Sequence, residues 1–176
     1  MKKKNFKMFL ILGLVLFLSV GYAVVNSVTL TITGSAGAGS EEINTFFTGA
    51  TEISKTSSAT VTPTVTAESK TASLAISNMT LNETVTVKYK IANEETDVGA
   101  KVTVDNITNS NPTYYDVSAT MSSSSIMCPS SSDIGDYNYL IVTVKLKKTP
   151  IDEASGKTNI GVTITSTAAE ATNCPE

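Results

Sequence analysis

The stretch TVTVKYKIA at residues 84–92 decides the fold class, because polar and apolar side chains alternate from Thr84 to Ile91. The apolar face is made of Val85, Val87, Tyr89 and Ile91. Hydroxylated and lysine side chains occupy the opposite face. A period of two residues is typical of a β-strand with one buried face. The stretch therefore predicts a strand whose sheet covers a hydrophobic core.

The same alternation recurs along the chain, with turn-forming residues between the segments. No segment after residue 25 shows an apolar period of 3.6 residues over the length of a helix. We expect strands at residues 28–33, 43–48, 59–67, 71–77, 84–92, 100–107, 114–121, 139–147 and 159–167.

Single residues refine this expectation. Gly49 is expected to stop the second strand, and Pro63 confines its strand to a sheet edge or a break. The apolar run at residues 139–147 predicts a central strand. The sequence as a whole predicts an all-β fold, a single antiparallel β-sandwich of jelly-roll or immunoglobulin-like connectivity behind an N-terminal signal helix.

Composition excludes most catalytic and nucleic-acid-binding classes. The 176 residues include 13 lysines but no arginine, histidine or tryptophan, and 48 of them are serine or threonine. Without histidine there is no Ser-His-Asp arrangement and no histidine-ligated zinc, and without arginine there is no bidentate clamp for phosphate. We therefore predict no enzyme, no catalytic residue, no metal, no cofactor and no nucleic-acid partner.

The N-terminus has the three-part layout of a secretory signal peptide. A basic segment at residues 1–7 precedes an apolar run at residues 8–20, and small residues lie at the −3 and −1 positions of a cut after Ala23. Residues 1–23 are thus a predicted signal peptide, removed by signal peptidase. The alternative is an uncleaved membrane anchor, although the apolar run is short for a span of roughly 20 residues. In both cases the protein lies outside the cytoplasm, secreted or at the cell surface.

The remaining chain divides into an N-terminal strand with a glycine-rich hinge, residues 24–40, and a sandwich domain, residues 41–176. Without the four lysines of residues 1–7, the formal charge is 9 − 16 = −7. An acidic chain disfavours nonspecific binding to nucleic acid.

Cys128 and Cys174 are the two cysteines of the chain. Two cysteines in an exported protein allow a single intramolecular disulfide, which in the chain-entropy model stabilises by about 4 kcal/mol. Free thiols and cross-links between subunits are the alternatives. We favour the intramolecular bridge.

Two tyrosine pairs are candidates for an aromatic ligand platform: Tyr114 with Tyr115, and Tyr137 with Tyr139. The alternative, which we favour, is that these rings pack in the core and at strand ends.

Four segments resemble the TasA/camelysin family of secreted proteins of Gram-positive bacteria. They are GYAVVNSVTLTITGSAGAG at residues 21–39, ASLAISNMTLNETVTVKYKIAN at 72–93, residues 101–120, and LIVTVKLKKTP at 140–150, in the same order as in the family. The resemblance consists of strand patterns and turns and includes no catalytic motif. Metalloprotease activity, described for some relatives, is not carried over because the chain has no histidine.

The resemblance implies a structural protein of the cell surface or biofilm matrix that self-assembles into fibres. In that family the N-terminal strand of one subunit can complete the sheet of the next. Here the pocket-filling residues of such a donor strand would be Val28, Leu30 and Ile32. The alternative is that this strand pairs within its own subunit.

A different class of function also stays open. The protein would then be a monomeric surface adhesin or binding module for a glycan or a host protein, with its site in the loops around residues 114–115 and 122–136. Its partners would be cell-surface or matrix components rather than further copies of the chain.

Overall fold

The computed structural model describes residues 27–36, 43–56, 58–66, 70–130, 136–152, 155–170 and 174. Within these residues all the regular elements are strands. They are β1 (Ser27–Ala36), β2 (Thr45–Lys55), β3 (Thr60–Val65), β4 (Thr71–Ser77), β5 (Thr84–Asn93), β6 (Gly99–Asn109), β7 (Tyr115–Met121), β8 (Tyr137–Leu146) and β9 (Lys157–Ala169). The predicted signal helix and the cleavage site at Ala23 lie outside the described residues.

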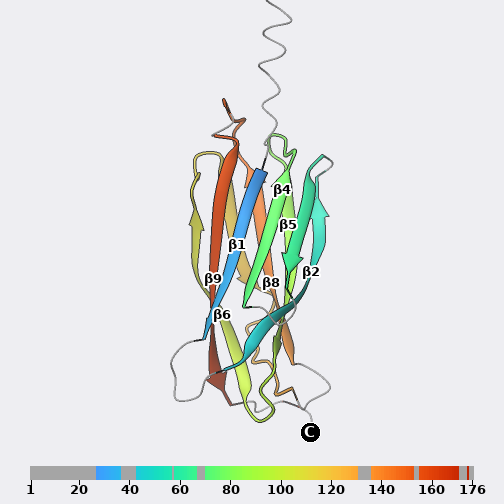
Figure 1. Ribbon diagram of the computed structural model, residues 1–176, viewed down its shortest axis with the longest axis vertical. Coiled ribbons are helices and arrows are strands. Elements are labelled where there is room, and N and C mark those ends of the chain that lie inside the picture. The colour runs from blue at the N-terminus through green and yellow to red at the C-terminus, as the bar shows by residue number, and fades with distance from the viewer. Residues whose placement is uncertain are drawn as a thin grey trace, which may run out of the picture.

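The strands form two sheets that pack around one core. One sheet has the order β3-β4-β1-β9-β6 and the other the order β2-β5-β8-β7. Both sheets run along the long axis of the molecule (Figure 1). Buried apolar side chains from both sheets form a single cluster, to which each sheet contributes alternate residues of its strands. The predicted all-β fold is confirmed, in a sandwich-like arrangement.

Burial along β5 follows the alternation seen in the sequence. Val85, Val87, Tyr89 and Ile91 are fully buried, and the residues between them are partly exposed. Burying a valine or isoleucine side chain contributes roughly 1.5–3 kcal/mol relative to leaving it in water. This face of β5 is therefore a main source of the stability of the fold.

The predicted places of two strands in their sheets are also confirmed. β3, which contains Pro63, lies at an edge of the five-stranded sheet, where a missing amide does not interrupt a ladder on both sides. β8, the strand of the apolar run, lies inside the four-stranded sheet between β5 and β7.

The prediction of a wholly antiparallel sandwich was wrong for one pair of neighbouring strands. β1 and β9 are parallel, from Ser27 opposite Lys157 to Ala36 opposite Ser166. Both strands start at the same end of the sandwich, so the first strand enters beside the last in the same direction (Figure 1). A period of two residues does not encode strand direction, and the sequence pattern therefore gave no sign of this pair.

Two predictions about glycines were also wrong. β2 does not stop at Gly49 but continues to Lys55, with register shifts between Phe47 and Gly49 and between Glu52 and Ser54 that absorb the irregularity. β1 does not end before Gly34, because the parallel pairing with β9 extends the strand to Ala36.

Buried polar groups are satisfied within the core. The Tyr89 hydroxyl donates to the Ser73 carbonyl oxygen at 3.1 Å, and the Tyr115 hydroxyl donates to the Gly156 carbonyl oxygen at 2.8 Å. Burial raises the pKa of Tyr115 to about 12 and that of Tyr89 further, so both hydroxyls remain donors at neutral pH. No buried side-chain nitrogen or oxygen in the described part of the chain lacks a hydrogen-bond partner.

Candidate assembly site: the amino-terminal strand and its slot

β1 occupies an interior position in the five-stranded sheet. It pairs antiparallel with β4, from Val28 opposite Ile76 to Thr33 opposite Thr71, and parallel with β9 along its whole length. Figure 1 shows β1 lying between β4 and β9. Among the described strands β4 and β9 do not pair directly, and β1 is the strand that joins the β3–β4 pair to the β9–β6 pair.

Of the three side chains predicted to fill pockets, the structure describes one. Ile32 is fully buried, whereas Thr29 and Thr31, on the other face of the strand, are exposed. The backbones of Val28 and Leu30 belong to β1, opposite Ile76 and Leu74 of β4. Their side chains lie outside the described part of the structure.

The groove that receives β1, here called the slot, is formed by β4 and β9. Apolar side chains of these two strands, each exposed by 2% or less, belong to the core on either side of β1: Leu74, Ile76, Ile160, Val162 and Ile164. On each side the neighbouring strand presents its backbone amides and carbonyls to β1. A strand with alternating apolar residues fits such a slot by main-chain hydrogen bonds and by side chains that set the register.

β1 is the first of the described strands, so only its carboxyl end connects it to the other eight. The connection to β2 consists of residues 37–44. Residues 37–42, which include most of the predicted glycine-rich hinge, lie outside the described residues. With this topology the strand can leave the slot without the chain being threaded through the sandwich.

The structure joins Cys128 and Cys174 in a disulfide with a Cα–Cα distance of 5.6 Å. Cys128 is buried, and its carbonyl oxygen accepts a hydrogen bond from Asn93 Nδ2 at 3.0 Å. The preceding residue, Met127, forms a β-bridge with Ala100 at the start of β6. The disulfide thus fixes the chain beyond β9 to the loop that packs against β6.

Sequence reasoning missed Glu83, which is only 3% exposed. Its carboxylate accepts hydrogen bonds from the backbone amides of Ser58 at 2.9 Å, Ala59 at 3.0 Å and Thr80 at 2.6 Å. Burial alone would raise the pKa of this carboxyl, but the amide donors outweigh burial and hold the pKa below its usual range. Glu83 thereby ties the β2–β3 connection to the β4–β5 turn. The spacing of Thr80 and Glu83, as in a capping box, was the available signal.

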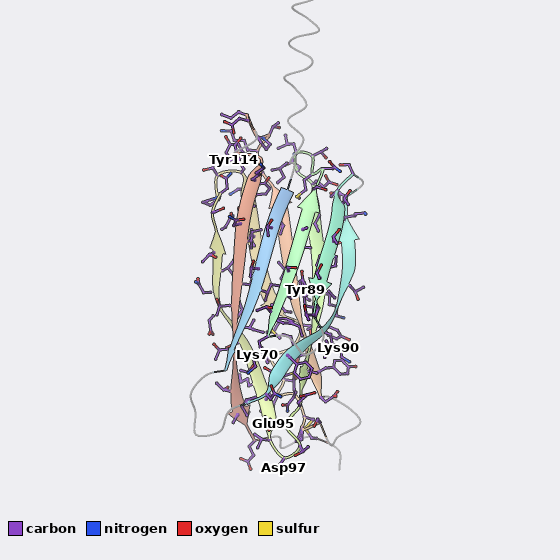
Figure 2. All side chains as sticks on the ribbon, viewed as in Figure 1. Lys70, Tyr89, Lys90, Glu95, Asp97 and Tyr114 are labelled. Carbon is purple, nitrogen blue, oxygen red and sulfur yellow. A yellow bond between two sulfur atoms is a disulfide. The ribbon has the colours of Figure 1, made fainter. Side chains whose placement is uncertain are left out.

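The two tyrosine pairs do not form one platform. Tyr115 is fully buried, so the favoured interpretation of core packing is correct for this ring. Tyr114 lies at the end of the sandwich opposite to Glu95 and Asp97 (Figure 2). Tyr137, in contrast, is 43% exposed and sits with Tyr139 on β8.

The described residues contain no group of three or more metal-ligating side chains. Nor do we find, in the same part of the chain, a helix with the length and apolarity that a membrane span needs. Comparison of the chain with protein-family models, with curated proteins and with solved structures finds no match in any of the three. The resemblance to the TasA/camelysin family therefore stays a prediction.

Proposed function

We propose that this protein is a secreted structural protein of the cell surface or biofilm matrix, which assembles into fibres by donating β1 to the slot of a neighbouring subunit. The observation that carries the proposal is the position of β1. It is the first of the described strands, is paired on both sides inside a sheet, and is joined to the other described strands at one end only.

The physical argument is an exchange of equivalent contacts. A donated β1 makes the same backbone pairs with β4 and β9 of the neighbour that it makes in its own subunit, and Ile32 fills the same pocket. The free-energy difference between the two states is then set mainly by the linker and the protein concentration, as in domain swapping. A head-to-tail donation that does not close on itself produces an open filament.

Two further features support the proposal. The predicted cut after Ala23 leaves three residues before β1, so cleavage frees the donor strand. Consecutive strands from β4 to β7 alternate between the two sheets, and so do β8 and β9. This alternation favours the jelly-roll type of connectivity that we infer for the subunit.

The test uses the exported protein beginning at Val24, studied by size-exclusion chromatography and electron microscopy over a range of concentrations. We expect fibres that grow with concentration. An excess of a peptide with the sequence of residues 27–36 should occupy free slots and shorten the fibres. The matched control is the same peptide with Ile32→Asp, which should have no effect because a buried charge is costly in the pocket. A monomer at every concentration, or fibres that ignore the wild-type peptide, would contradict the proposal.

A further inference from the structure

The outer face of the four-stranded sheet carries two lysines beside two tyrosines. Lys88 and Lys90 project from β5, and Tyr137 and Tyr139 project from β8. Lys90 lies directly opposite Tyr139 in the antiparallel register. We call these four residues the lysine–tyrosine patch. Figure 2 places Lys90 in the half of the molecule that ends at Glu95 and Asp97, far from Tyr114.

The four side chains hold each other in defined positions. Lys88 Nζ lies 3.6 Å from the centroid of the Tyr139 ring, and Lys90 Nζ lies 4.2 Å from that of Tyr137. The two rings meet edge to face, with their centroids 5.5 Å apart. An ammonium group above a ring is attracted by the electrons of the ring face, which restricts the long lysine side chain. The patch therefore presents two positive charges at fixed places beside aromatic surface.

These charges have no acidic partner in the described part of the chain. No described carboxylate lies within 4.0 Å of either amino group, and the ion pair between Lys147 and Asp116 involves neither lysine. Outside residues 1–7 the protein carries a formal charge of −7. Because neither lysine has a carboxylate partner among the described residues, both are available to an anion from outside.

The surroundings of the patch indicate the kind of anion. Neighbouring outward positions carry small hydroxylated side chains, among them Thr86 and Thr143, whose hydroxyls lie 3.2 Å apart. The patch lies on strands and not in a loop, so its surface suits an extended polymer. Hydroxyl groups and aromatic rings are suited to sugar hydroxyls and sugar C–H faces, and the lysines are suited to carboxylates.

We propose that the lysine–tyrosine patch binds an acidic polysaccharide, a linear polymer of hexuronate residues. The carboxylates pair with Lys88 and Lys90, and a sugar ring packs on the exposed surface of Tyr137. The site belongs to the sheet that does not contain β1. Binding is therefore independent of strand donation, and a monomer is competent for it.

The experiment measures binding of the exported protein to polygalacturonate, with a neutral glucan as the control polymer, by affinity electrophoresis. We expect retardation by polygalacturonate alone, and retardation that falls as salt screens the charges. Combining Lys88→Gln with Lys90→Gln should weaken binding about tenfold, because two ion pairs at an exposed site are lost. Tyr137→Thr should also weaken binding while leaving the charge unchanged.

The matched control combines Lys101→Gln with Lys148→Gln, which removes the same charge outside the patch and should leave binding within about twofold of the wild type. Thermal unfolding checks that each variant is folded. Absence of binding by the wild type overturns the proposal, as does an equal loss in the control variant. A patch variant that changes the oligomeric state, with no polysaccharide bound by the wild type, would instead assign the patch to a contact between copies of the chain.

Discussion

Ile32 of β1 lies opposite Val162 of β9 in the parallel register, and both side chains are buried in the core between the two sheets. The first and last strands of the described chain are therefore packed together along their length. Because β1 also pairs with β4, the strand that we propose to be donated is at the same time a structural member of the five-stranded sheet. A subunit that releases its own β1 therefore needs another strand to complete its five-stranded sheet.

The burial of Ile32 predicts a large effect of truncation. Ile32→Ala should lower the free energy of unfolding by about 2–5 kcal/mol, because it removes buried apolar surface and leaves a cavity. Thr31→Ala, on the exposed face of the same strand, should change it by less than about 0.5 kcal/mol. Urea unfolding of both variants measures the difference. Equal effects would show that β1 is not seated with Ile32 in the core.

Glu83 predicts a dependence of stability on pH. The pKa of Glu83 in the folded chain is held below its ordinary value of 4.5. The carboxylate therefore stabilises the fold fully above pH 4.5, and this contribution is lost as the pH falls through the lower pKa of the folded state.

Glu83→Gln should remove that pH dependence and lower the free energy of unfolding at pH 7 by about 1.5–3 kcal/mol, since a neutral amide oxygen replaces a charged acceptor of several backbone amides. Unfolding curves at pH 7 and pH 3 for the wild type and the variant provide the measurement. A matched control is Asp97→Asn, which changes an exposed carboxylate beyond the other end of β5 and should leave the pH dependence of the wild type in place. A variant whose stability falls with pH as steeply as that of the wild type would contradict the assigned role.

The disulfide predicts a loss of stability on removal. Replacing Cys128 and Cys174 together by serine should lower the free energy of unfolding by about 4 kcal/mol. Without the bridge, which joins residues 46 positions apart, the unfolded chain is no longer closed into a loop and gains conformational entropy. Titration of thiols in the denatured, unreduced wild type should find none. Two titratable thiols per chain would show that the bridge does not form in the purified protein.

The sequence predicted those parts of the fold that depend on local patterns. Alternation at residues 84–92 identified β5 and its buried face, and Pro63 placed β3 at an edge. The direction of β1 was not predictable, because it depends on pairing with a strand some 130 residues away. Glu83 was missed for a similar reason: two of its amide donors, Ser58 and Ala59, lie in a different turn.

The tyrosine pairs also combine a feature that the local sequence predicts with one that depends on the pairing of distant strands. Sequence spacing identified both pairs as candidates, but burial separates them: Tyr115 is inside the core, and Tyr137 is exposed beside a lysine of the neighbouring strand. Only the pairing of β5 with β8 brings Lys90 next to the rings. Cross-strand register therefore defines the patch, and no single segment of sequence contains it.

Strand donation itself is tested most directly by a cross-link between Thr31 of β1 and Ser73 of β4, which lie directly opposite each other. Opposed residues of antiparallel strands have Cα atoms about 4.5–5.5 Å apart, within the range of a disulfide. Thr31→Cys and Ser73→Cys are combined in the chain beginning at Val24, which is assembled, oxidised and separated on a denaturing gel without reductant. Thr31→Cys alone is the control. We predict a ladder of covalent dimers, trimers and longer species, because each β1 lies in the slot of its neighbour. Cross-linked monomers alone, from a sample that has assembled, would contradict strand donation.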